Sequence, residues 1–192
     1  VNNTESGSND KYGISSMCGS NGTVYTVWGD YRDGNWNIYF AKSLDAGATW
    51  STNLRVNSAG SGLTPQTKPS LAVYDSMTLY VTWQDSVDGN WNIYLAKSTD
   101  GGATWATNVR VDDTGTQINI QQNPQVFCDN EGYAHVIWED RRFATANYDI
   151  FYTTNKPWAP SAPANLKAGG ANPSQWQNTN TFTLTWTNPT DI

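Results

Sequence analysis

Short runs of apolar and aromatic residues alternate with polar, glycine-rich segments over the first 155 residues of the chain. Runs that are rich in β-branched and aromatic residues, and bounded by Gly, Asn, Asp and Ser, are typical of strands joined by turns. The runs that predict strands are residues 14–19, 23–28, 36–42, 54–56, 70–74, 78–83, 91–97, 109–111, 125–128, 134–138 and 149–153. The pattern therefore predicts an all-β fold.

The predicted strands recur with a fixed period. Residues 33–56 match residues 88–111 at 19 of 24 positions, which is an offset of 55 residues. The same offset relates Trp28, Trp83 and Trp138, each of which begins a Trp-x-Asp triplet. Self-similarity at a fixed period indicates repeated structural units. Four short antiparallel strands in each unit are typical of one blade of a β-propeller.

The third repeat is incomplete, because a Pro-rich stretch follows its third predicted strand in place of a fourth. We expect about three four-stranded antiparallel blades in residues 1–155, the last of them incomplete, and a linker at residues 156–163. Val1 is in phase with Val56, at the end of a fourth strand. We therefore interpret the chain as an excerpt of a longer polypeptide, with further blades upstream.

A turn motif, Ser-x-Asp-x-Gly-x-Thr-Trp, occurs twice at the same phase of the repeat. An Asp side chain in a tight turn accepts hydrogen bonds from backbone N–H groups, and a Gly adopts a left-handed conformation at little cost. The Trp then covers the turn. We expect these structural roles of Ser43, Asp45, Gly47 and Trp50 in the first copy, and of Ser98, Asp100, Gly102 and Trp105 in the second.

The motif resembles the Asp-box, or bacterial neuraminidase repeat, of sialidase-like β-propellers. The resemblance covers residues 1–155 and implies that each motif lies between the third and fourth strands of a blade, on the rim and away from the active site. Residues 164–192 contain two further predicted strands, and they resemble the start of a fibronectin type III-like module. The second resemblance implies the first strands of a β-sandwich after the linker.

The composition restricts the partners and the compartment. A net charge of −6 and a pI near 4.5 argue against a nucleic acid or an anionic membrane as the partner. The sequence contains no run of about 18 apolar residues, so it predicts no membrane-spanning helix. Cys18 and Cys128 are two periods apart, and strands two blades apart do not approach within the distance that a disulfide needs. We therefore expect two small buried apolar residues.

The candidate ligand-binding residues lie in loops that surround the central channel of a propeller on one face. Carboxylates, guanidinium groups and aromatic rings are the groups that recognise sugars. The residues of this kind are Asp30, Tyr31, Arg32, Trp36, Asp85, Trp91, Asp140, Arg141 and Arg142. A competing interpretation is structural: each repeated Asp orders its own turn, because a catalytic residue is needed once whereas a structural one recurs in every blade.

We assign no catalytic residue and expect no cofactor. Sialidases of the resembled family use three arginines, a Tyr–Glu pair and an Asp, and the Phe/Tyr-Arg-Ile/Leu-Pro motif of the first arginine does not occur here. His135 is in phase with Tyr25 and Tyr80, so we expect a packed strand residue rather than a base. The Asp30-x-x-Asp33 turn offers oxygen ligands suited to calcium, although hairpin-turn chemistry explains the same residues.

The sequence thus favours a secreted or cell-surface, non-catalytic binding or scaffolding module for glycans or surface proteins. Two alternatives stay open. The chain is a fragment of a sialidase-like glycoside hydrolase whose catalytic residues lie mostly outside it, or it is a structural surface subunit that self-associates through open blade edges.

Overall fold

The chain divides into a compact unit of residues 1–156 and a second unit of residues 157–192 in the computed structural model. The structure describes residues 1, 10–58, 64–112, 120–142 and 147–157. The predicted linker beyond Pro157 and the predicted β-sandwich in residues 164–192 therefore lie outside the described residues. None of the described segments is a helix long and apolar enough to cross a membrane.

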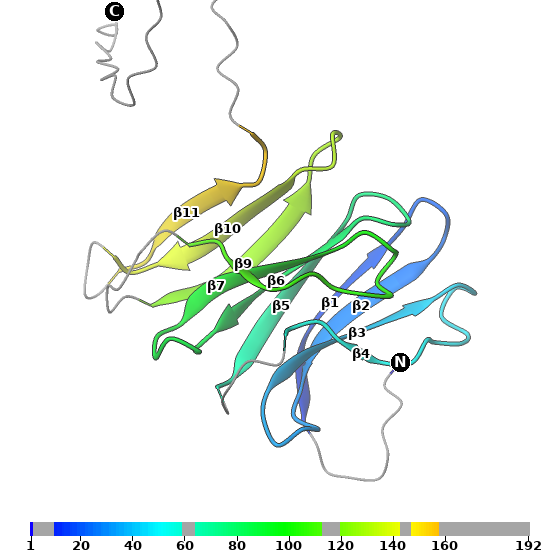
Figure 1. Ribbon diagram of the computed structural model, residues 1–192, viewed down its shortest axis with the longest axis horizontal. Helices are drawn as coiled ribbons and strands as arrows, with labels where there is room; N and C mark the ends of the chain where they lie inside the picture. Colours follow the sequence, from blue (N-terminus) through cyan, green and yellow to red (C-terminus); the bar gives the residue numbers. More distant parts are fainter. Residues whose placement is uncertain (2–9, 59–63, 113–119, 143–146, 158–192) are drawn as a thin grey trace, which may run out of the picture. The chain divides into compact units, whose positions relative to one another are not determined.

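The described residues of the first unit form three antiparallel sheets (Figure 1). Blade 1 contains β1 (Lys11–Cys18), β2 (Val24–Asp30), β3 (Asn37–Ser43) and β4 (Leu54–Arg55); blade 2 contains β5 (Gln66–Val73), β6 (Leu79–Asp85), β7 (Asn92–Ser98) and β8 (Val109–Arg110); blade 3 contains β9 (Gln121–Cys128), β10 (Ala134–Asp140) and β11 (Asp149–Thr154). Each sheet pairs its strands in chain order. The expected all-β fold of two complete blades and an incomplete third is confirmed.

The first strands of the three blades lie side by side, with β5 between β1 and β9 (Figure 1). Each of these strands pairs only with the second strand of its own blade in the described sheets, so it forms the inner edge of that blade. In a propeller the inner edges line the central channel. The geometry therefore brings the residues of β1, β5 and β9 onto one surface.

Apolar side chains between neighbouring blades form the core. Tyr25, Ile38 and Phe40 of blade 1 belong to one buried cluster with Val81 and Trp83 of blade 2. A second cluster joins blade 2 to blade 3 through Tyr80, Ile93, Val136 and Trp138. Burying one such side chain contributes about 1.5–3 kcal/mol, so packing between the blades contributes strongly to the stability of the unit.

Each inner strand contains a bulge at an equivalent position. The pairing register with the second strand shifts there in all three blades. The residues with positive φ at the bulges are Gly13 (64°), Lys68 (53°) and Asn123 (55°), which are 55 residues apart. The strands begin three or four residues earlier than the sequence analysis predicted. The prediction was late because Gly13, Pro69 and Pro124 interrupt the apolar pattern, and such residues usually end a strand.

The repeated turn motif connects the third strand of a blade to the fourth. In the first copy, Asp45 accepts hydrogen bonds from the hydroxyl of Ser43 (2.7 Å) and from the backbone N–H (2.8 Å) and hydroxyl (2.6 Å) of Thr49. The second copy repeats these bonds around Asp100. Hydrogen bonds from the threonine hydroxyl and N–H lower the pKa of each Asp to about 2, since they favour the ionised carboxylate.

The glycines of the two motif copies adopt left-handed conformations, whereas the two tryptophans pack differently. Gly47 and Gly102 adopt φ values of 94° and 85°. The indole N–H of Trp50 donates to the carbonyl oxygen of Gly47 (3.0 Å) and closes the first turn. Trp105 instead reaches across to blade 1, where its ring meets Phe40 edge-on with 5.3 Å between ring centroids.

The cysteines are both free, and the expectation that both are buried is wrong for Cys18. Cys18, Val73 and Cys128 occupy the same phase of the repeat. Val73 packs against the cluster of blades 1 and 2, and Cys128 packs against that of blades 2 and 3. Cys18 belongs to the first described blade, so no described blade covers it and it is exposed.

Candidate functional site

The bulges of the three inner strands surround one cavity of about 260 Å³. Tyr12, Lys68 and Asn123 supply its polar and aromatic wall, and Pro69 and Pro124 supply rigid apolar surface. Lys68 and Asn123 hold left-handed backbone conformations, which cost about 1–2 kcal/mol for a residue such as lysine and less for asparagine. Backbone strain of this kind concentrates at functional sites. This cavity, which we call the bulge cavity, is therefore the first candidate for a binding site.

A chain of hydrogen-bonded polar side chains runs from Lys68 and Asn123, which line the bulge cavity, to Gln122 and Glu139 of blade 3. The ammonium group of Lys68 donates to Oδ1 of Asn123 at 2.5 Å. The amide group of Asn123 donates to Oε2 of Glu139 at 2.8 Å, and Gln122 donates to the same oxygen at 3.0 Å. The backbone N–H of Asn123 donates to Oε1 of Gln84 at 3.2 Å. The bulge thus carries an ammonium group, amides and a carboxylate within one hydrogen-bonded set.

Aromatic residues extend this surface on the side of blade 1. The ring of Tyr12 meets Trp36 edge-on with 4.5 Å between centroids, and Trp36 meets Tyr31 at 5.3 Å. Burial raises the pKa of Tyr12 further above neutrality, and its phenol is a hydrogen-bond donor at neutral pH. Two of the nine predicted ligand-binding residues, Tyr31 and Trp36, therefore connect to the bulge cavity through Tyr12.

The three repeated aspartates are buried inside their own turns. Asp30, Asp85 and Asp140 are 0%, 3% and 0% exposed. Each accepts a hydrogen bond from the indole N–H of the Trp two residues earlier, at 2.9, 3.2 and 3.2 Å. Each also accepts the backbone N–H two residues later, at 3.0, 2.9 and 2.8 Å. Their carboxylates thus order the turns, as the structural interpretation of the sequence proposed.

The two arginines of these turns pair with the buried aspartates. Arg32 donates to Oδ2 of Asp30 at 2.5 Å, and Arg142 donates to Oδ2 of Asp140 at 2.6 Å. Burial acts to raise the pKa of both carboxyls, but the hydrogen bonds from the arginine and the indole outweigh it and lower the pKa. The guanidinium groups also stack on aromatic rings, at 4.2 Å for Arg32 and 3.7 Å for Arg142.

Blade 2 lacks this ion pair, because Val87 stands at the phase of the two arginines. Burial accordingly raises the pKa of Asp85. Of the two remaining predicted residues, Arg141 lies over the ring of Tyr148 at 5.1 Å. Trp91 is half-buried, and its carbonyl oxygen accepts the backbone N–H of Gln121 at 2.9 Å. Tyr31 and Trp36 are thus the predicted residues that join the aromatic surface beside Tyr12.

Sequence reasoning missed the residues of the bulge cavity itself. Lys68, Asn123 and Tyr12 did not enter the predicted site, although the channel face was expected to hold it. The available signal was their spacing: Gly13, Lys68 and Asn123 recur every 55 residues at the start of an inner strand. A Lys and an Asn at the position of a glycine indicate variable side chains on a constant backbone.

The carboxylates of the first hairpin turn have separate partners. Asp33 accepts hydrogen bonds from the hydroxyl of Tyr39 (2.7 Å) and the amide of Asn37 (3.1 Å), whereas Asp30 faces Trp28 and Arg32. Among the described residues, no group of three or more His, Cys, Asp and Glu side chains is placed to hold a metal ion.

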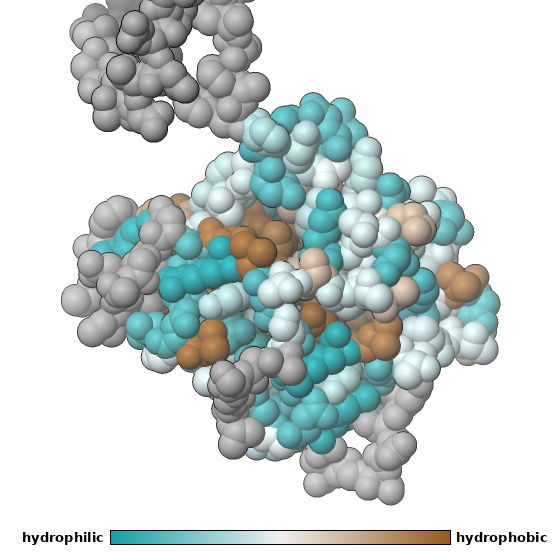
Figure 2. All heavy atoms as spheres, in the orientation of Figure 1, coloured by the Kyte–Doolittle hydropathy of each residue, from teal (hydrophilic) through white to brown (hydrophobic). Residues whose placement is uncertain are grey.

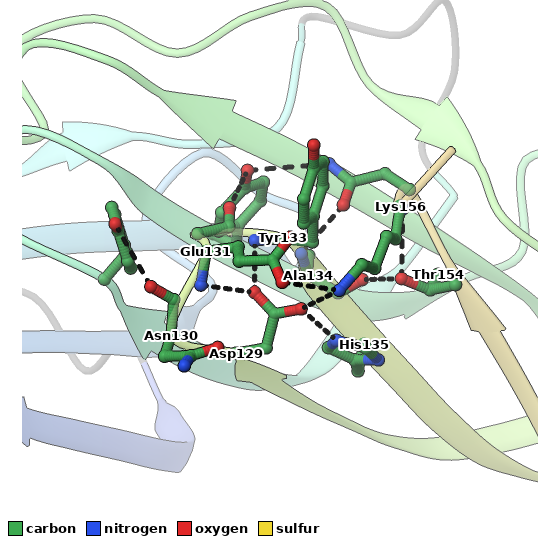
Figure 3. A network of polar contacts seen from close by, with 12 residues as sticks. Asp129, Asn130, Glu131, Tyr133, Ala134, His135, Thr154 and Lys156 are labelled. Atoms are coloured by element: carbon green, nitrogen blue, oxygen red, sulfur yellow. Dashed lines mark hydrogen bonds and ion pairs between the residues drawn. The ribbon is translucent and has the colours of Figure 1, made fainter. Parts of the chain in front are cut away.

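The single histidine belongs to a polar network on the outer face of blade 3 (Figure 3). Its Nε2 lies 3.2 Å from Oδ2 of Asp129, and its Nδ1 lies 2.7 Å from the hydroxyl of Tyr152. The ring of His135 stacks on Phe127 (5.0 Å) and on Tyr152 (5.8 Å). Burial acts to raise the pKa of Asp129, but backbone N–H groups, His135 and Lys156 outweigh it and lower that pKa. His135 is thus a packed strand residue in this structure.

Solved structures with the same fold include enzymes that act on carbohydrates. A Hadza microbial sialidase, Hz136, is 14% identical with a TM-score of 0.60, over 77% of this chain and 35% of its own. An α-L-arabinanase of Penicillium chrysogenum is 20% identical with a TM-score of 0.52, over 76% of this chain and 45% of its own. Zg3597, a family 117 glycoside hydrolase of the marine bacterium Zobellia galactanivorans, is 15% identical with a TM-score of 0.52, over 77% of this chain and 52% of its own.

The chain spans about a third to a half of the length of these structures. At such identities the likeness shows the fold alone: an incomplete β-propeller of the kind found in glycoside hydrolases. No protein-family model matches the chain, and no curated protein matches it either.

Proposed function

We propose that this chain is a glycan-binding part of a sialidase-like β-propeller, and that the bulge cavity is its binding surface. The observation that carries the proposal is the cavity of about 260 Å³ at the inner strands, with Lys68 and Asn123 beside the ring of Tyr12. Aromatic rings stack on the apolar faces of sugars, and ammonium and amide groups donate to hydroxyl oxygens. Both kinds of group converge at this one position.

We propose a binding role rather than a catalytic one for the described residues. Glycoside hydrolysis generally needs two carboxyl groups that face a common substrate. Glu139 is the carboxylate of the bulge, and the aspartates at the strand ends are buried and bonded within their own turns. The alternative is that the chain is a fragment of a glycoside hydrolase, with the rest of the catalytic set outside it.

The assignment of the turn motif to the Asp-box and the secreted or cell-surface location belong to the same proposal. They are supported by the motif sequence, by its place between the third and fourth strands, and by the Asn-, Thr- and Trp-rich composition. Surface proteins are the other partners compatible with such a module.

A glycan-binding experiment on the full chain tests the proposal. The chain would be screened against a panel of neutral and acidic oligosaccharides, and positive binders would be titrated by calorimetry. We expect Lys68→Ala and Trp36→Ala to weaken binding at least tenfold. Lys156→Ala is the control, since that exposed lysine is at the opposite ends of the strands and pairs with Glu131. Absence of binding to every glycan, or equal loss in the control, would contradict the proposal.

Turnover of a fluorogenic sialoside or arabinoside by the full chain decides between binding and hydrolysis. Hydrolysis that is lost in Glu139→Gln would replace the binding role with an enzymatic one. No turnover, together with glycan binding, supports the non-catalytic role.

A second candidate function, self-assembly, is favoured by the outer face of blade 3. Ile150, Tyr152 and Phe127 are 71%, 54% and 49% exposed. The residues at the same strand positions in blades 1 and 2 face the next blade. Phe40, the counterpart of Tyr152, and Ile93, the counterpart of Ile150, are buried there. Exposed apolar surface of this kind favours association. Light scattering tests it: a dimer that dissociates in Ile150→Glu supports assembly, and a monomer at high concentration contradicts it.

A further inference from the structure

A second cavity, of about 390 Å³, lies between blade 2 and blade 3 at the outer strands. Tyr80, Leu95 and Val109 line it on the side of blade 2, and Val136 and Thr153 line it on the side of blade 3. Hydrophobic side chains gather over the region where these two blades meet (Figure 2). We call it the interblade cavity. It is distinct from the bulge cavity at the inner strands.

The equivalent position between blade 1 and blade 2 is filled by an indole ring. Tyr25 and Phe40 precede Tyr80 and Leu95 by one period, and Val81 precedes Val136 by the same 55 residues. Trp105 packs against the cluster that contains those three residues, with its ring edge-on to Phe40 at 5.3 Å. The interblade cavity is therefore lined as the binding site of Trp105 is lined.

The turn that presents Trp105 also has a polar anchor. The ammonium group of Lys42 donates to the carbonyl oxygen of Gly101 at 2.8 Å, so it holds the backbone of the turn against blade 1. Lys97 is the counterpart of Lys42 and lines the interblade cavity, with its ammonium group 5.3 Å from the ring of Tyr80. The cavity thus combines an apolar pocket with a cation placed to bind a backbone carbonyl.

Blade 3 supplies no motif of its own for this position. Asn155 takes the place of the motif serine after β11, and Lys156 and Pro157 follow it. In the described structure β11 is also the edge strand of its sheet, whereas β3 and β7 each pair with a fourth strand. The apolar pocket and the open strand edge therefore lie next to each other.

We propose that the interblade cavity and the edge of β11 form a docking site for a partner polypeptide that carries a tryptophan turn followed by an extended strand. The tryptophan fills the cavity as Trp105 fills the preceding one, and a backbone carbonyl of the turn accepts a hydrogen bond from Lys97. The strand pairs with β11 in the manner of β-strand addition. The argument for this occupant is continuity with the interface between blade 1 and blade 2.

A peptide with the sequence of residues 98–111 of this chain is the probe, because it contains the turn, the tryptophan and the fourth strand. It would be labelled and titrated with the full chain by fluorescence anisotropy. We expect saturable binding that weakens at least tenfold when the peptide carries Ala in place of its Trp, since a buried Trp dominates such contacts. This comparison uses the unaltered protein and so does not depend on the folding of a variant.

Leu95→Trp in the protein would fill the cavity with an indole and is expected to weaken binding at least tenfold. Leu44→Trp is the matched control, since the same substitution at a leucine that is 77% exposed leaves the cavity open. The proposal is overturned if the peptide does not bind, if the Ala peptide binds equally well, or if Leu95→Trp binds as tightly as Leu44→Trp.

Discussion

The indole ring of Trp105 packs edge-on against the phenyl ring of Phe40, with 5.3 Å between the ring centroids. The two residues belong to different blades, so this contact joins the turn between β7 and β8 of blade 2 to β3 of blade 1. Trp50, the counterpart in the first motif, packs against Trp28, Tyr39 and Ala41 of its own blade. The tryptophan of the motif in blade 2 thus packs against the neighbouring blade, whereas the tryptophan of the motif in blade 1 packs against its own sheet.

The first prediction follows from this difference. Trp105→Ala should lower the free energy of unfolding by about 3–4 kcal/mol, because it removes a large side chain from between two blades. Trp50→Ala should cost about 2 kcal/mol or less, since only one sheet loses contacts. Urea unfolding followed by circular dichroism measures both values. Equal costs would mean that the contact with Phe40 adds nothing to the stability.

Much of the fold could be predicted from the sequence because the repeat is strong and the strands are rich in β-branched and aromatic residues. The inner strands were placed too late, because Gly13, Pro69 and Pro124 mark bulges within strands as well as loops. Cys18 was wrongly predicted to be buried, since phase within a repeat does not reveal whether a neighbouring blade covers the residue. Burial at the ends of an array depends on partners that a periodic pattern does not encode.

The candidate site was predicted only in part. Tyr31 and Trp36 connect to the bulge cavity through Tyr12, as loops at the channel face should. The aspartates of that face form hydrogen bonds within their own turns. The sequence does not encode these distances. Lys68 was not predicted as a site residue, because a lysine beside a proline is also typical of an ordinary loop. Its positive φ, which marks it as exceptional, is visible only in the structure.

The second prediction concerns the missing ion pair of blade 2. Val87→Arg should stabilise the protein at pH 7 by about 1–2 kcal/mol, because the arginine can pair with buried Asp85 as Arg32 pairs with Asp30. Val87→Met is the control for added length without charge. Urea unfolding of the three proteins at pH 7 gives the difference, and an equal gain in the methionine variant would exclude an electrostatic origin.

The third prediction is the pH dependence of that gain. Burial raises the pKa of Asp85 in the folded protein above its unfolded value. The contribution of Asp85 to stability is therefore complete below the unfolded pKa, which is about 3.9, and it is lost as the pH rises through the higher folded pKa. The advantage of Val87→Arg should accordingly shrink when unfolding is measured at pH 3.5. An advantage that is constant with pH would show that Asp85 does not cause it.

The fourth prediction concerns acid and the motif aspartates. The pKa of Asp45 and of Asp100 is about 2 in the folded protein, because the hydroxyl and the N–H of a threonine bond the carboxylate. A lowered pKa stabilises the fold above the unfolded value of about 3.9, and this stabilisation is lost as the pH falls from about 4 towards 2. The variant Asp45→Asn/Asp100→Asn should show a smaller fall of Tm over that interval. Carbon NMR titration of Thr49→Val should show a higher pKa for Asp45 but an unchanged one for Asp100.

The fifth prediction separates the backbone of Lys68 from its side chain. Lys68→Gly relieves a left-handed conformation worth about 1–2 kcal/mol, and it loses about 0.4–1 kcal/mol through the greater freedom of glycine in the unfolded chain. The net effect should be a gain of about 0.5–1 kcal/mol in stability, together with the loss of glycan binding. Lys68→Ala should lose the binding without the gain, because alanine keeps the strain. If Lys68→Gly is less stable than Lys68→Ala by about 0.4–1 kcal/mol in urea unfolding, the left-handed backbone at residue 68 stores no strain. If both variants still bind the glycan, the ammonium group does not hold the ligand.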